Sequence, residues 1–173
     1  MNAVKKATSI TITSKIAAIA SLLRSQMPYA QIGFSPWVEN DLTLRFEDRH
    51  SIDLSVNFPQ SCEKLRCRCM LVQVTISSAG ALGSGVPNSK NAVGASANHP
   101  QAELVNTGGT VEAEFSGYGF DGTQQWKFAT ADGGKFLGKA LPSADGQQLI
   151  RSIGQSITEL SPSFAMVESR KAS

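Results

Sequence analysis

The segment that decides the fold is "DLTLRFEDRHSIDLSVNF", residues 41–58, because apolar and polar residues alternate through most of its length. The apolar residues recur at every second position in two runs, Leu42, Leu44 and Phe46, then Ile52, Leu54, Val56 and Phe58. Successive side chains of a β-strand point to opposite faces of the sheet. The pattern therefore predicts a hairpin that turns near residues 48–50 and has one buried and one wet face.

The next segment, "CEKLRCRCMLVQVTIS" (residues 62–77), contains all three cysteines of the chain. It continues the alternation, which predicts a third strand beside the hairpin. The residues expected on its core face are Leu65, Cys67, Cys69 and Leu71, and those expected on its other face are Lys64, Arg66 and Arg68. Beyond Met70 both faces become apolar, which is typical of a strand that is covered on both sides.

Amphipathic helices are predicted near both ends of the chain. Residues 14–27 carry apolar side chains at intervals of three or four, with Thr13 as the expected N-cap and Pro28 as the stop signal. The preceding "TSITIT" alternates like a short strand, so the start of this helix stays open. Residues 145–160 repeat the helical spacing, with Asp145 as the expected N-cap.

Between the helices lies a second set of strands. Three runs from about residue 110 to 141 are separated by the turn sequences "DGT" and "ADGG". Residues 77–100, rich in Gly, Ser and Ala, are expected to form a flexible excursion, and residues 163–173 a frayed tail. Residues 1–173 thus predict a single α+β domain, an antiparallel sheet or sheets of two meanders with five to six strands, flanked by an N-terminal and a C-terminal amphipathic helix.

The net charge of +2 is too small to indicate a nucleic-acid or membrane partner. Residues 1–38 carry Lys5, Lys6, Lys15 and Arg24 and no acidic residue, as organelle transit peptides do. The apolar run "IAAIASLL" follows a polar stretch, however, and is far shorter than the roughly 20 residues that span a bilayer. We therefore expect a cytoplasmic protein without a membrane segment.

The cysteines raise the possibility of a zinc site, to which His50 or His99 could add a fourth ligand. Cys67 and Cys69 form a C-x-C pair inside a predicted strand, however, without the tight turn of a zinc knuckle. We expect the thiols to pack in the core, and we expect no metal and no other cofactor. No catalytic motif is present either, so an enzyme built from scattered residues stays open only as an alternative.

The first alternative, ahead of an enzyme, is a nucleic-acid-binding accessory protein. Arg45, Lys64, Arg66 and Arg68 are expected to share the outer face of the first sheet, where phosphates could bind. Nearby acidic residues dilute this patch, and no aromatic residues interleave with it as a stacking platform would require.

The order of elements resembles that of the class I type III secretion chaperones, small dimeric proteins that present a sheet and helix surface to an unfolded segment of a partner. The resemblance covers "SKIAAIASLLRSQ", the hairpin and "GKALPSADGQQLIRSIGQSITEL", and it concerns element order and hydrophobic pattern. It implies a protein-binding role. A subunit of a larger assembly, such as a virion or plasmid component, fits equally well.

The most favoured function is therefore a non-catalytic module for protein–protein interaction or assembly, and a homo-oligomer is expected. Aromatic residues are enriched at interface hot spots. The candidate contact residues are Tyr29 and Trp37, in the Pro-rich connection after the first helix, and Trp126.

Overall fold

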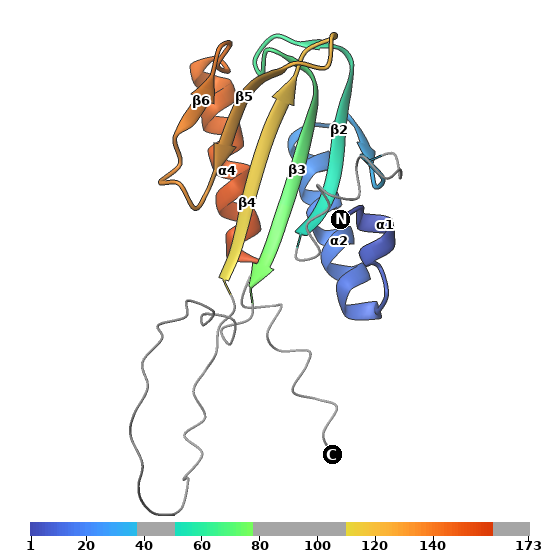
Figure 1. Cartoon of the computed structure of the whole chain (residues 1–173). Helices are drawn as coiled ribbons and strands as arrows, with labels where there is room; N and C mark the ends of the chain where they lie inside the picture. The colour runs from blue at the N-terminus through green and yellow to red at the C-terminus, as the bar shows by residue number, and fades with distance from the viewer. Residues whose placement is uncertain (38–50, 78–109, 161–173) are drawn as a thin grey trace, which may run out of the picture.

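In the computed structural model, which describes residues 1–37, 51–77 and 110–160, six strands form one antiparallel sheet (Figure 1). Each strand pairs with the next one in the chain. The strands are β1 (Gln31–Gly33), β2 (Ser51–Cys62), β3 (Cys67–Ser77), β4 (Thr110–Tyr118), β5 (Gln124–Ala129) and β6 (Phe136–Gly138). The helices are α1 (Ala3–Lys6), α2 (Ile10–Gln26) and α4 (Ala144–Glu159). The predicted α+β class is confirmed.

Helices α2 and α4 pack on one face of the sheet, which we call the inner face (Figure 1). Every second residue of the central strands is buried against them, with Leu54 of β2 opposite Val72 of β3, and Val72 opposite Phe115 of β4. The helices contribute Ile16, Ile19, Leu23, Ile150, Ile153 and Ile157 to this core. The alternation predicted for β2 and β4 is confirmed, because it matches the period of the pleat.

Both long helices begin earlier than predicted. Helix α2 begins at Ile10 because the side chain of Ser9 caps it, accepting a hydrogen bond from a backbone N–H at 3.3 Å. Residues 10–13, which alternate like a strand, therefore form the first turn of the helix. Ser143, and not Asp145, caps α4, with its Oγ accepting a hydrogen bond from the N–H of Gly146 at 3.2 Å.

The face assignment predicted for Cys69 and Leu71 is wrong, because both lie on the opposite, outer face. The inner-face residues of β3 are Met70, Val72 and Val74. Cys69 lies on the opposite, outer face, where its partners are Asn57 of β2 and Tyr118 of β4. The pairing of β2 with β3 is regular from Ser51 and Thr75 to Asn57 and Cys69, so Cys69 and Leu71 lie on the same face as Asn57 and Ser55. Cys67, at the start of β3, is buried as predicted.

Helix α4 docks so closely on the β2–β3 turn that Gly146 has no room for a side chain. A Cβ at this position would overlap the carbonyl oxygen of Lys64, which already accepts a hydrogen bond from the N–H of Ser143 at 2.9 Å. We expect Gly146→Ala to lower the free energy of unfolding by about 1–3 kcal/mol through overpacking, although alanine normally favours a helix over glycine by about 1 kcal/mol. Urea denaturation followed by circular dichroism measures the change.

The matched control is Ser152→Ala, at an exposed position of the same helix. It is expected to leave stability unchanged or raise it by a few tenths of a kcal/mol. Equal stability of the two variants would contradict the close approach of α4 to the turn.

Several predicted features lie outside the described residues. They are the first strand of the hairpin (42–46), nearly all of the excursion at 77–100, the tail at 163–173, and Arg45, His50 and His99. Within the described ranges, none of the helices has the length and apolar character needed to cross a bilayer.

Candidate binding groove and its buried anchor

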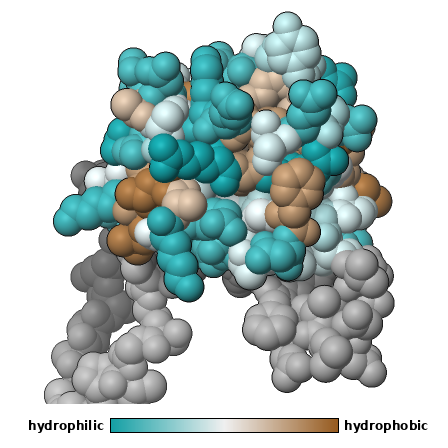
Figure 2. Space-filling model, turned by 90° about the horizontal axis from the view of Figure 1, so that it is seen from above, coloured by the Kyte–Doolittle hydropathy of each residue, from teal (hydrophilic) through white to brown (hydrophobic). Residues whose placement is uncertain are grey.

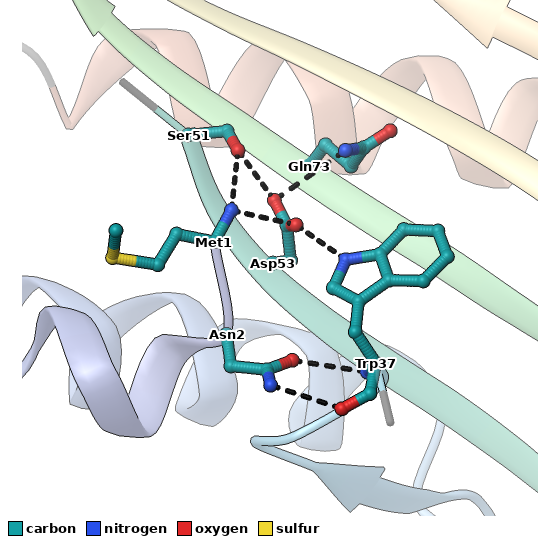
Figure 3. Close-up of polar contacts among 6 residues, drawn as sticks. All are labelled: Met1, Asn2, Trp37, Ser51, Asp53 and Gln73. Atoms are coloured by element: carbon teal, nitrogen blue, oxygen red, sulfur yellow. Dashed lines mark hydrogen bonds and ion pairs between the residues drawn. The ribbon is translucent and has the colours of Figure 1, made fainter. Parts of the chain in front are cut away.

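The sheet face turned away from α2 and α4, which we call the outer face, contains a buried carboxylate. Asp53 of β2 is only 1% exposed. Its Oδ2 lies 2.8 Å from the α-ammonium group of Met1 and accepts a hydrogen bond from the indole Nε1–H of Trp37 at 2.6 Å (Figure 3). Its Oδ1 accepts hydrogen bonds from Ser51 Oγ at 2.7 Å and from Gln73 Nε2 at 3.4 Å. We call these residues, together with Asn2, the anchor cluster.

The local chain path explains how these residues meet. Residues 1–2 continue the sheet along the edge of β2 beyond β1, since Asn2 bridges to Asp53 and the N–H of Asp53 donates to the carbonyl oxygen of Met1 at 2.9 Å. The side chain of Asn2 then pairs with the backbone of Trp37. Its Nδ2 donates to the Trp37 carbonyl at 3.1 Å, and its Oδ1 accepts from the Trp37 N–H at 3.0 Å.

The anchor cluster therefore fixes Trp37 at both its backbone and its ring. A buried carboxylate is tolerated only when a cation and hydrogen-bond donors satisfy it, and here both are supplied. Among the described residues, no buried side-chain nitrogen or oxygen lacks a hydrogen-bond partner. The contacts with Asn2 and Asp53 thus hold Trp37 in position beside the outer face of the sheet.

Next to the anchor cluster the outer face is hollowed into a cavity of about 300 Å³, which we call the groove. Its lining comes from the segment before Trp37 and from strands β2, β3 and β4, and comprises Ser35, Pro36, Trp37, Ser55, Asn57, Cys69, Met70, Leu71 and Tyr118. Asn57 is exposed, and its Nδ2 donates to Ser55 Oγ at 3.2 Å. The groove thus joins aromatic and aliphatic surface to a few polar groups, as ligand sites commonly do.

The groove carries no ionised group at neutral pH. Burial raises the pKa of the Tyr118 phenol, although its hydrogen bond with Ser116 acts in the other direction. Burial also raises the pKa of the Cys69 thiol, against the opposing charge of Arg68. Both groups therefore remain protonated, and the other lining residues have no titratable side chain.

The three predicted contact residues have different environments. Trp37 lines the groove, and Tyr29 is 88% exposed in the turn before β1. Trp126 is completely buried on the inner face, where its Nε1–H donates to the carbonyl oxygen of Leu65 at 2.6 Å. Trp126 therefore has no exposed surface with which to contact a partner. Its ring fills the space that Gly117 of β4, which has no side chain, leaves in the core.

The groove residues Asn57, Leu71 and Tyr118 and the anchor residue Asp53 were not predicted as site residues. Asp53 occupies an alternate position of an amphipathic strand, which is typical of a solvated side chain. The signal that it is buried lies in Met1, Asn2 and Trp37, far away in the sequence. A pattern within one strand cannot reveal it.

Of the predicted basic residues, the three that the structure describes, Lys64, Arg66 and Arg68, do not share one strand face. Strand β2 ends at Cys62 and β3 begins at Cys67, so Lys64 and Arg66 lie exposed in the turn between them. The side chain of Arg68 donates a hydrogen bond to the carbonyl oxygen of Pro59, and its guanidinium carbon lies 5.3 Å from the ring centroid of Phe120. Viewed from above, the molecule is mainly hydrophilic with scattered hydrophobic side chains (Figure 2).

All three cysteines are free thiols, and no group of potential metal ligands occurs in the part of the chain that the structure describes. Burial, reinforced by the neighbouring thiols of Cys62 and Cys69, raises the pKa of Cys67 to about 12. Since the thiolate is the reactive form, Cys67 should be inert in the folded protein.

We therefore expect iodoacetamide at pH 8 to label the half-buried Cys62 well before Cys67. At this pH only about one in ten thousand Cys67 side chains is a thiolate, and the sulfur is also shielded from the reagent. Tandem mass spectrometry of a time course gives the rate for each residue, and labelling in denaturant should remove the difference. Equally fast labelling of Cys67 in the folded protein would contradict its buried position.

No curated protein and no solved structure matches the chain. One family model, described as a domain of unknown function, matches residues 4–163. This match includes all six strands and helices α2 and α4. The chain therefore belongs to that family of domains of unknown function.

Proposed function

We propose that this protein is a non-catalytic interaction module that binds a partner protein in the groove. The observation that carries the proposal is the composition of the groove lining, with Trp37 and Tyr118 beside Leu71 and the polar groups of Ser55 and Asn57. Tryptophan and tyrosine dominate interface hot spots because each offers a large rigid surface together with a hydrogen-bonding group.

The support of Trp37 strengthens the proposal. The indole is held by Asp53, and the backbone of the same residue is held by Asn2. A side chain that is already ordered loses little conformational entropy when a partner binds, so more of the contact energy appears as affinity.

Site-specific photocrosslinking tests the proposal. A photoreactive phenylalanine analogue is placed at Gln31, in cells that naturally produce the protein. Gln31 is exposed on β1 as the cross-strand partner of the groove residue Asn57, and it does not itself line the groove. The matched control carries the analogue at Glu112, which is exposed on the outer face of β4 and pairs with Thr75, outside the groove lining. We expect a defined protein adduct from position 31 and none from position 112.

Substitution then tests whether the groove itself is required. We expect Asn57→Phe, which fills the groove from an exposed position, to abolish partner binding while leaving the melting temperature unchanged. Glu112→Phe should bind normally. No adduct from position 31, or equal adducts from positions 31 and 112, would contradict the proposal.

A nucleic-acid-binding accessory function is a second candidate, favoured by one observation. Phe120 is 79% exposed beneath the guanidinium of Arg68, which supplies the exposed aromatic ring that the sequence pattern lacked. Lys64 and Arg66, exposed in the β2–β3 turn, provide cations for phosphates. Base stacking on an aromatic ring beside basic residues is the usual mode of single-strand binding.

Fluorescence anisotropy with labelled oligothymidylate tests this candidate. Binding through Phe120 should weaken on Phe120→Ala and fall steeply as salt increases. Binding that is absent, or that is unaffected by Phe120→Ala, would eliminate it.

A further inference from the structure

We infer that the groove accepts an electrically neutral aromatic side chain, tyrosine-like in size and polarity, from its partner protein. This inference rests on the function proposed above and adds the chemistry of the occupant. It follows from the volume of the groove, from its charge and from the kinds of surface that line it.

The volume limits the size of the occupant. Sites for whole small-molecule ligands extend from about 300 to about 1,000 Å³. The groove, at about 300 Å³, is at the lower end of that range. It can hold one large side chain with the adjoining backbone of a peptide, and it is too small for a helix or for several side chains at once.

The charge of the groove excludes ionised occupants. None of the nine lining residues is ionised at neutral pH. The nearest acid of the anchor cluster, Asp53, is 1% exposed and is already paired with the α-ammonium group of Met1. The charges that act on the lining from outside are also engaged: Arg68, near Cys69, donates to the carbonyl oxygen of Pro59, and Glu114, near Tyr118, pairs with Lys127 at 2.8 Å. A lysine, arginine, aspartate or glutamate entering the groove would lose its hydration without gaining a counter-charge, which is strongly unfavourable.

The lining favours an aromatic ring over an aliphatic chain. The rings of Trp37 and Tyr118 can pack edge-to-face or offset against another ring, and the sulfur of Cys69 is a favourable neighbour for an aromatic edge. Ser55, Asn57 and the phenol of Tyr118 offer donors and acceptors to a hydroxyl or a backbone amide. A tyrosine side chain uses both kinds of surface.

The two tryptophans provide an internal control for the test. The chain contains only Trp37 and Trp126, so a ¹H–¹⁵N spectrum has two indole N–H resonances. One reports on the groove and the other on the buried inner face. The probe is N-acetyl-tyrosinamide, compared with N-acetyl-leucinamide and N-acetyl-lysinamide.

We expect the tyrosine probe to move the Trp37 resonance saturably, with a dissociation constant in the millimolar range, as is usual for so small a ligand. The Trp126 resonance should stay in place. The leucine probe should bind several-fold more weakly and the lysine probe not at all. Affinity should change by less than about twofold between about 0.05 M and 0.5 M NaCl, because no ion pair forms.

The same titration on Asn57→Phe should leave the Trp37 resonance still, with an unmoved Trp126 resonance as evidence that the variant is folded. Binding that survives in this variant would place the probe elsewhere and overturn the inference. Equal or tighter binding of the lysine probe would also overturn it. If the tyrosine probe fails while photocrosslinking from position 31 captures a protein, the neutral aromatic occupant is wrong and the proposed function stands.

Discussion

Trp126→Ala is expected to lower the free energy of unfolding by about 4 kcal/mol, the usual cost of removing a fully buried tryptophan. The indole has no exposed surface, packs 5.9 Å from the ring of Phe136 between centroids, and donates a hydrogen bond to the Leu65 carbonyl at 2.6 Å. Alanine would leave a large cavity and an unpaired buried carbonyl group. Urea denaturation at equilibrium measures the difference.

Two further variants separate packing from surface effects. Trp126→Phe keeps part of the ring volume but loses the hydrogen bond, so we expect an intermediate loss of stability. Leu137→Ala, at a position 61% exposed on β6, should change stability by less than about 0.5 kcal/mol. A loss below about 1 kcal/mol for Trp126→Ala would contradict the placement of this residue in the core.

Asp53→Ala is expected to cost about 3 kcal/mol, because it removes the counter-charge of the Met1 α-ammonium, which keeps its hydrogen bond to Ser51 Oγ, and leaves the indole N–H of Trp37 without its acceptor. The same substitution should release Trp37, so its fluorescence should shift toward that of a solvated indole. Chemical denaturation gives the stability, and the emission spectrum gives the environment of the ring.

The control for Asp53 is an ion pair of the same length in a different environment. Glu114 and Lys127 are also 2.8 Å apart, but their side chains are 34% and 41% exposed. Water screens this pair, so Glu114→Ala should cost no more than about 0.5 kcal/mol. Similar costs for the two substitutions would show that burial does not strengthen the contact of Asp53.

The fold could be predicted because burial on one face leaves a period in the sequence. Ile52, Leu54 and Val56 alternate with polar residues as the pleat requires, and the same holds for Val111, Ala113 and Phe115. The prediction failed for Cys69 and Leu71 because β3 is apolar on both faces in this stretch, so alternation alone does not mark the inner face. Their side of the sheet follows from the pairing of Cys69 with Asn57 and of Leu71 with Ser55.

The groove could be predicted only in part, because its lining comes from segments far apart in the chain. Trp37 was predicted as a contact residue on its aromatic character alone. Tyr118 and Asn57 acquire their significance from the pairing that brings both beside Cys69. Such neighbours depend on which residues of two strands pair, and the alternation within one strand does not give that.

The pairing of Asp53 with the α-ammonium of Met1 has a practical consequence for anyone who prepares this protein. An affinity tag fused ahead of Met1 converts that cation into a neutral amide and forces extra chain past Ser51. Acetylation of the same nitrogen would have the same electrostatic effect. A tag at the other terminus leaves the charge on this nitrogen, so a comparison of the two tagged forms measures what the ion pair contributes to stability.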